Sequence, residues 1–189
     1  MAGWIVLVYR VPTEPASGRV GIWRDLKQMG GLYLQQCVCM LPDREDLRAR
    51  LTRVTGRIAD LGGEHWLLDI PSMPLQDEDR LIRSFRTLRN KEYAEIVEEC
   101  QTKFLKEIEF EHFRENYTFE EAEEISQDLD KIRRWFQRIT DRDWFEADGR
   151  AEVEEWIDRC AGLLAQFEEE VYRRQGDDFG SGQGGSDDE

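Results

Sequence analysis

The first 70 residues alternate between short apolar runs and segments whose apolar positions recur at helical spacing. Residues 4–9 form an unbroken apolar run, WIVLVY, and residues 65–70 form a second segment rich in large apolar side chains. Such runs are typical of β-strands, and the first is expected to be a central strand covered on both faces. Residues 32–41 predict one strand, or two strands with a tight bend near residues 35–37.

Two amphipathic helices are predicted between these strands. The first begins near Ser17, a suitable N-cap, and continues to Met29, where Gly30 and Gly31 end it. The second follows Pro42. Its apolar stripe, with alternating spacings of four and three residues, consists of Leu47, Leu51, Val54, Ile58 and Leu61. The order strand, helix, one or two strands, helix, strand favours an α+β fold of the ferredoxin-like β-α-β-β-α-β type.

The second half has helical periodicity throughout. Residues 77–112 carry apolar positions at helical spacing, with a break expected near residues 90–91. Thr118 and Glu121 match a capping box, and the apolar stripe that follows them is repeated after residue 150. Two matched stripes joined by a turn predict an antiparallel helical hairpin. With the helix before it, the hairpin is expected to form a three-helix unit.

Charge divides the chain at nearly the same place. The formal net charge is −15, of which residues 1–74 carry +1 and residues 75–189 carry −16. Pro71 and Pro74 interrupt any regular element at that point. We therefore predict an α+β domain over residues 1–74 and a helical domain over residues 75–175. Residues 176–189, rich in Gly and Asp, are expected to form a disordered acidic tail.

Composition excludes several classes of protein. The net charge argues against a non-specific grip on nucleic acid by the whole chain, and against an anionic membrane surface as partner. No segment approaches the ~20 apolar residues of a membrane span, and the early apolar run is too short for a secretory signal. The four cysteines are too few and too scattered for a disulfide framework. We therefore expect a cytoplasmic protein with free thiols.

Known catalytic motifs do not occur in the sequence. It has no phosphate loop, no Rossmann glycine fingerprint, no nucleophile elbow and no zinc-protease motif. The two histidines leave little material for a triad or a histidine metal site, so we predict no catalytic residue, no metal and no cofactor. A divalent cation held by the carboxylates around His112 is the alternative to a solvated charged helix face.

Two cysteines lie close together in the first half. Cys37 and Cys39 are two residues apart, which places both thiols on the same face of an extended strand, roughly 7 Å apart. That separation is beyond easy disulfide reach, and no second cysteine pair follows to complete a zinc site. The two residues are either small buried thiols or a pair with a redox or metal role.

Basic side chains gather around the first strand and the first helix. The candidates are Arg10, Arg19, Arg24 and Lys27. A basic surface at a strand–helix junction could hold an oxyanion through bidentate arginine contacts, or contact the phosphates of nucleic acid. The alternative is that these side chains form ion pairs with the acidic second half.

The same residues lie in segments that resemble a known family. Residues 4–15, 19–27 and 31–42 are similar to the N-terminal region of the chromate-resistance regulatory proteins of the ChrB family, and so are residues 92–100 and 142–145. The resemblance covers about residues 3–175. It implies transcriptional control in the bacterial chromate response, with chromate as effector. Proteins of this family usually carry a further C-terminal domain, so a separate protein with that domain is an expected partner. The family's usual Gly-Val-Trp-Val is here residues 37–40, CVCM.

More distantly, the first half resembles the central domain of the repressor PaaX and the small dimeric nuclease subunit of CRISPR adaptation. That nuclease needs an acidic metal ligand where this chain has Arg10, and a guanidinium repels a cation. We therefore expect a non-enzymatic regulatory module that forms a homodimer and contacts DNA through its N-terminal half. The alternatives are a protein that binds or reduces chromate through its arginines and cysteines and, last, a metal-dependent nuclease.

Overall fold

Strand β1 (Trp4–Arg10) lies inside a four-stranded antiparallel sheet in the computed structural model, which describes residues 3–14 and 16–181. The sheet order is β2-β3-β1-β4. The other elements of this half are α1 (Ala16–Gln28), β2 (Leu32–Gln35), β3 (Val38–Pro42), α2 (Glu45–Asp60) and β4 (Glu64–Ile70). The predicted central strand is confirmed, since β1 pairs with β3 on one side and β4 on the other.

The α+β class is also confirmed. Residues 32–42 form two strands, with the turn at residues 36–37, rather than one. The narrower ferredoxin-like assignment stays a prediction, because β2 is short and its pairing with β3 shifts register between Tyr33 and Gln35. Helix α1 ends where the glycines predicted, and Gly30 adopts a φ of 76°, which favours a residue without a Cβ.

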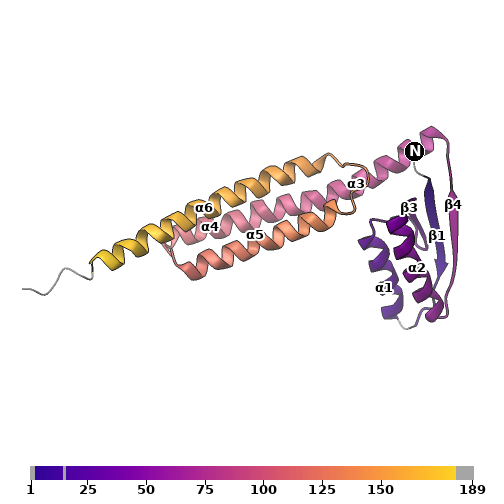
Figure 1. Cartoon of the computed structure of the whole chain (residues 1–189), viewed down its shortest axis with the longest axis horizontal. Coiled ribbons are helices and arrows are strands. Elements are labelled where there is room, and N and C mark those ends of the chain that lie inside the picture. The colour runs from indigo at the N-terminus through magenta and orange to yellow at the C-terminus, as the bar shows by residue number, and fades with distance from the viewer. Residues whose placement is uncertain (1–2, 15, 182–189) are drawn as a thin grey trace, which may run out of the picture. The chain divides into compact units, whose positions relative to one another are not determined.

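Helices α1 and α2 cover one face of the sheet (Figure 1). Most apolar positions that predicted these helices are fully or almost fully buried. The exceptions are Leu61, which packs partly buried at the edge of this core, and Val20 and Trp23, which were expected to widen the stripe of the first helix and are exposed. The buried set on this face consists of Ile5, Leu7, Tyr9, Ile22, Leu26, Met29, Cys39, Leu41, Leu47, Leu51, Val54 and Ile58. Burial of a side chain of this size stabilises the fold by about 1.5–3 kcal/mol, so the stripe is the main reason that both helices form here.

A smaller aromatic cluster lies on the opposite face of the sheet. Trp4 stacks on Phe85 and on Phe145, with ring centroids 5.8 and 5.5 Å apart, and its indole N–H donates to the buried carboxylate of Glu78 at 3.3 Å. Phe85 lies on α3 (Leu75–Glu99), whereas Phe145 lies in residues 141–146, far along the sequence. The turn between the predicted hairpin helices therefore supplies part of this core.

The chain folds as two compact units. The first comprises Met1–Leu88 with Asp141–Glu146, and the second comprises Arg89–Thr140 with Ala147–Glu189. The chain passes from the first unit to the second within α3, between residues 88 and 89. Helix α3 itself begins at Leu75, directly after the predicted boundary between residues 74 and 75. Each unit has its own buried apolar core.

The helical half departs from the predicted count of three helices, which is wrong. Within the described residues, α3 is followed by a π-helical segment η1 (Cys100–Phe104), α4 (Leu105–Phe113), α5 (Phe119–Thr140) and α6 (Gly149–Ser181). No break occurs at residues 90–91, which lie inside α3. The irregularity falls instead at η1 because Ile96, Cys100, Phe104 and Ile108, all buried, follow one another at spacings of four. Such a row drifts around a helix of 3.6 residues per turn, and a wider π turn brings it back to one side.

The predicted hairpin is present as α5 and α6, which run side by side (Figure 1). One of the two hydrogen bonds of its capping box is present, since the Glu121 backbone N–H donates to Thr118 Oγ1 at 3.2 Å. The apolar stripes of both helices are buried together with η1 and α4. Of the predicted acidic tail, residues 176–181 continue α6 and residues 182–189 lie outside the described residues. No described helix has the length and apolar character needed to cross a membrane.

Candidate anion-binding site

Three of the predicted site residues line one cavity. Arg10 ends β1, Arg19 lies in the first turns of α1, and Cys37 occupies the turn between β2 and β3. We call the space that they share the strand-end cavity. Its volume is about 540 Å³, and its lining is Tyr9, Arg10, Val11, Arg19, Val20, Trp23, Gln36 and Cys37. Two guanidinium groups beside an exposed thiol are a suitable environment for an oxyanion.

Arg10 is exposed and is already paired. Its Nη2 donates to Glu64 Oε2 at 3.0 Å, and 79% of its side chain is exposed. Glu64 is directly opposite Arg10 on the neighbouring strand, so this pair follows from the register of β1 with β4. The partner of Arg10 therefore comes from the first half of the chain.

Arg24 and Lys27 are not among the residues that line that cavity. The Lys27 ammonium lies over the Trp23 ring, 5.1 Å from its centroid. Arg24 is exposed on α1, and within the described part of the chain it has no ion-pair partner. The four predicted basic residues thus do not all line one cavity, since Arg24 lies five residues from Arg19 and on a different side of α1.

The two neighbouring cysteines have different environments. Cys39 is fully buried on β3, and burial raises the pKa of its thiol to about 12. Cys37 is exposed, so the prediction of two small buried thiols is correct for Cys39 and wrong for Cys37. The reason is the tight turn at residues 36–37, which places Cys37 at the end of the sheet, beyond the cover of the helices. Only Cys37 is placed to meet a ligand.

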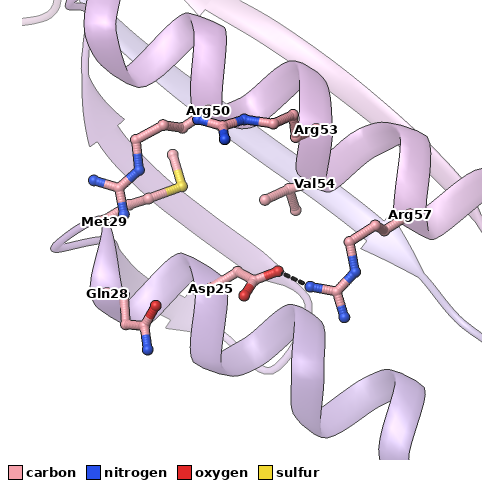
Figure 2. Close-up of a pocket in the computed structure, with 7 residues that line it drawn as sticks. All are labelled: Asp25, Gln28, Met29, Arg50, Arg53, Val54 and Arg57. Carbon is pink, nitrogen blue, oxygen red and sulfur yellow. Dashed lines mark hydrogen bonds and ion pairs between the residues drawn. The ribbon is translucent and has the colours of Figure 1, made fainter.

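A second cavity, with three arginines in its lining, lies between α1 and α2 (Figure 2). We call it the helix-pair cavity. Arg50, Arg53 and Arg57 enter it from α2 at spacings of three and four residues, which places them on one side of the helix. Its volume is about 270 Å³, and the lining is completed by Asp25, Gln28, Met29 and Val54. Met29 and Val54 are buried and form its apolar floor.

The charges in this cavity do not cancel. Arg57 forms an ion pair with Asp25, the single acidic residue of the lining. Figure 2 shows Arg50 and Arg53 without an acidic neighbour among the residues drawn, and across the described residues neither has an ion-pair partner. Two guanidinium groups, with up to ten N–H donors between them, are therefore available to an anion with several oxygens. This is the arrangement that recognises phosphate and related groups.

The arginines of α2 could have indicated this site in the sequence, but the helix was interpreted from its apolar stripe alone. Residues 44–57 contain five arginines, and their spacing leaves three of them on the side that faces α1. The other two have structural partners. Arg48 donates to Asp43 at 2.6 Å and to Asp69 at 2.7 Å, which raises the pKa of Arg48 and lowers that of Asp43. Arg44 pairs with Asp46 and lies over the Trp144 ring.

The two helices together form a basic layer, defined here as α1 and α2. They carry seven Lys/Arg and four Asp/Glu, although the whole chain is strongly acidic. Neither histidine lies in the two cavities, and His112 shares a hydrogen bond with Tyr117 Oη at 2.6 Å. Among the residues described, no three His, Cys, Asp or Glu side chains are grouped to hold a metal ion. The geometry thus defines a protein with two arginine-lined cavities on an α+β unit.

Comparison with known proteins identifies the family. Residues 19–178 match the family model described as Protein ChrB, N-terminal, and the chain belongs to that family. It is 28% identical over 164 residues to Protein ChrB of Cupriavidus metallidurans, an alignment that covers 85% of this chain and 46% of that protein. The chain therefore spans about half the length of this curated relative. No solved structure matches the chain.

Proposed function

We propose that this chain is a regulatory protein of chromate resistance that acts by binding and that its basic layer contacts the phosphates of nucleic acid. Membership of the ChrB N-terminal family supports the regulatory role. The observation that carries the nucleic-acid contact is the pair of arginines Arg50 and Arg53 in the helix-pair cavity, because the single acidic residue of its lining is paired with Arg57 instead. Phosphate contacts of this kind supply affinity and orientation without reading sequence.

The charge distribution confines the contact to one part of the molecule. The first unit has a net charge of −1 and the second −14, so the second unit repels a polyanion. The basic layer is the region where attraction exceeds repulsion at short range. Because exposed charges are screened beyond about 10 Å at 0.1 M salt, this local attraction can act despite the acidic remainder.

The test is fluorescence anisotropy with DNA from the promoter region upstream of this chain's own gene, at low salt. The full chain is compared with the double variant Arg50→Ala/Arg53→Ala, and with Arg83→Ala, an exposed arginine outside the basic layer, as the matched control. We expect the double variant to bind at least about tenfold more weakly and to reduce the salt slope by about 2. Equal binding by the double variant, or no binding by the wild type at any concentration, contradicts the proposal.

A second candidate function is the binding of chromate in the strand-end cavity. Its support is the convergence there of Arg10, Arg19 and the exposed Cys37. One accessible thiol cannot supply all the electrons that reduction of Cr(VI) to Cr(III) takes, so the cavity favours binding rather than reduction. Calorimetry with chromate, with sulfate as the control anion, tests it, and an Arg10→Ala variant that binds chromate as well as the wild type contradicts it.

A further inference from the structure

The outer edge of β4 has no strand beside it in the sheet. β4 is the last strand in the order β2-β3-β1-β4, and Figure 1 shows it at the margin of the first unit. It pairs with β1 without interruption from Glu64 to Ile70, so its outer edge is straight over seven residues. Six of these seven residues are exposed. An edge of this length presents a row of backbone N–H and C=O groups that can pair with another strand.

β4 has few of the features that usually protect an edge strand: its two charged side chains, Glu64 and Asp69, are paired with Arg10 and Arg48 of the same unit. It contains no Pro, no Lys and no bulge, whereas the opposite edge, β2, has four residues and an irregular register. Its exposed apolar side chains are Trp66, Leu67 and Leu68, at 55%, 40% and 49% exposure. Trp66 and Leu68 lie on one face of the sheet, opposite Val8 and Val6 of β1. Leaving such an edge in water favours association, so a partner is expected to cover it.

We propose that β4 pairs antiparallel with β4 of a second copy of this chain, about a two-fold axis at Leu67. Leu67 is the midpoint of the strand, and this register uses all seven residues. It places Trp66 opposite Leu68 of the second copy, and His65 opposite Asp69 of the second copy. Both pairs occur twice, because a two-fold interface repeats every contact.

The two neighbouring registers are less complementary. An axis at Trp66 places His65 opposite Leu67, and an axis at Leu68 places Leu67 opposite Asp69. Each loses the pairing of imidazole with carboxylate, which the axis at Leu67 makes twice. The axis at Leu67 also sets Glu64 opposite Ile70, but only at the two ends of the paired segment. Registers in which the axis falls between two residues are excluded. In antiparallel pairing, two opposite residues either both direct their backbone N–H and C=O groups toward the partner strand or both direct them away, and neighbouring residues of one strand differ in this respect. The pairing of charge and apolar groups therefore selects the axis at Leu67.

Such a dimer has a continuous sheet of eight strands with α1 and α2 of both copies on one face. The reason is that the two-fold axis of an antiparallel edge contact is perpendicular to the sheet and does not exchange its faces. The two helix-pair cavities then open on the same side of the dimer. Dimer formation does not depend on the proposed nucleic-acid contact, and it is measured without DNA.

The first test is sedimentation equilibrium of the full chain without DNA, for the wild type, Leu67→Lys and Leu75→Lys. In the dimer, Leu67→Lys sets two like charges against each other at the axis, which we expect to weaken dimerisation at least about tenfold. Leu75→Lys replaces an exposed leucine outside the strand and leaves dimerisation unchanged. A monomeric wild type, or equal dimerisation of Leu67→Lys, overturns the proposal.

The second test measures the register in a Cys37→Ser background, which removes the exposed native thiol. A short bismaleimide is expected to crosslink Leu67→Cys, because this position meets itself across the axis. Glu64→Cys serves as control, since six strand positions, about 20 Å, separate it from its own copy. A dimer in which Leu67→Cys is not crosslinked, or in which both variants crosslink equally, forms through another surface and overturns the proposal.

Discussion

Two cysteines separated by a single residue show how strongly local placement controls chemistry. Cys37 lies in an exposed turn, whereas Cys39, Cys100 and Cys160 are buried. A buried thiol reacts slowly because the reagent cannot reach its sulfur until the chain opens. We expect one of the four thiols of the native chain to react quickly with Ellman's reagent at pH 8, and the other three only on unfolding. Loss of the fast phase in Cys37→Ser identifies it, whereas two fast thiols in the wild type would contradict the assignment.

The buried hydroxyl and thiol groups of the first unit make it sensitive to alkali. Tyr9 and Tyr33 share a hydrogen bond of 2.9 Å, and burial raises the pKa of both side chains, as it raises that of Cys39 to about 12. In the unfolded chain the thiol ionises near 9.0. Above that pH the unfolded state loses a proton that the folded state keeps, so stability falls as pH rises, by up to about 1.4 kcal/mol per pH unit for each group.

Urea unfolding from pH 8 to pH 11 measures this effect. The wild type is expected to lose stability steadily above pH 9, and Cys39→Ala to lose it less steeply, because one of the ionising groups is gone. The variant is less stable at pH 8, since it leaves a small cavity. Parallel slopes for the two proteins would show that Cys39 does not contribute.

Single residues were predicted well where burial alone places them and poorly where a partner is needed. Ile22, Leu26 and Leu47 follow a periodic stripe, and all are buried. The pair of Asp25 with Arg57 joins two helices whose packing the sequence does not state. Arg50 and Arg53 of the helix-pair cavity have no such pair among the described residues. The sequence could not identify them as available, because it does not state which acidic residues the packing brings near them.

At the scale of elements, the π-helical segment η1 is the clearest irregularity with a cause in the sequence. Its one additional residue keeps Cys100 and Phe104 on the buried side. Deleting the exposed Gln101 changes the spacings from Ile96 onward to four, three and four, which suit a regular α-helix. We expect this deletion to fold with a melting temperature close to that of the wild type.

Deletion of Glu95, an exposed residue in the regular part of α3, is the control. It rotates the segment after the deletion by about 100° relative to the segment before it, so buried positions of one segment become exposed. We expect the free energy of unfolding to fall by several kcal/mol. Circular dichroism during heating compares the two deletions. If the Gln101 deletion is as damaging as the Glu95 deletion, η1 is not a one-residue insertion into an α-helix.

The helices and strands were predicted from local periodicity. The predictions fail where contacts with residues far along the sequence determine what a segment does. The α5–α6 turn illustrates this. Residues 141–146 were expected only to connect two helices, yet Phe145 stacks on Trp4, and the Trp144 indole N–H donates to the Met29 carbonyl at 3.3 Å. Nothing in the spacing of residues 140–149 indicates a contact with the first strand. The strands themselves, being marked by short apolar runs, were found correctly, including the exposed edge β4.

At the scale of the whole molecule, the acidic charge belongs almost entirely to the second unit, with 27 Asp/Glu and 13 Lys/Arg. Burial raises the pKa of Glu107, and Asp128, Glu121 and Glu124 on α5 raise it further. The carboxylates of this unit therefore repel one another in the folded state. The helical unit is stable because its buried stripes outweigh that repulsion, which added salt screens.

Salt is therefore expected to have opposite effects on stability and on binding. Raising NaCl from 0.05 to 0.5 M shortens the screening length severalfold, so the melting temperature of the helical unit should rise while the proposed nucleic-acid contact weakens. Glu120 and Glu124 are exposed on α5 and four residues apart, a like-charge pair that destabilises a helix. The variant Glu124→Gln removes this repulsion and keeps Glu120, whose charge in the first turn is favoured by the helix dipole. Its melting temperature should be higher at low salt and respond less to NaCl. A salt response identical to that of the wild type would show that these carboxylates are already screened, and that repulsion within the acidic unit does not limit its stability.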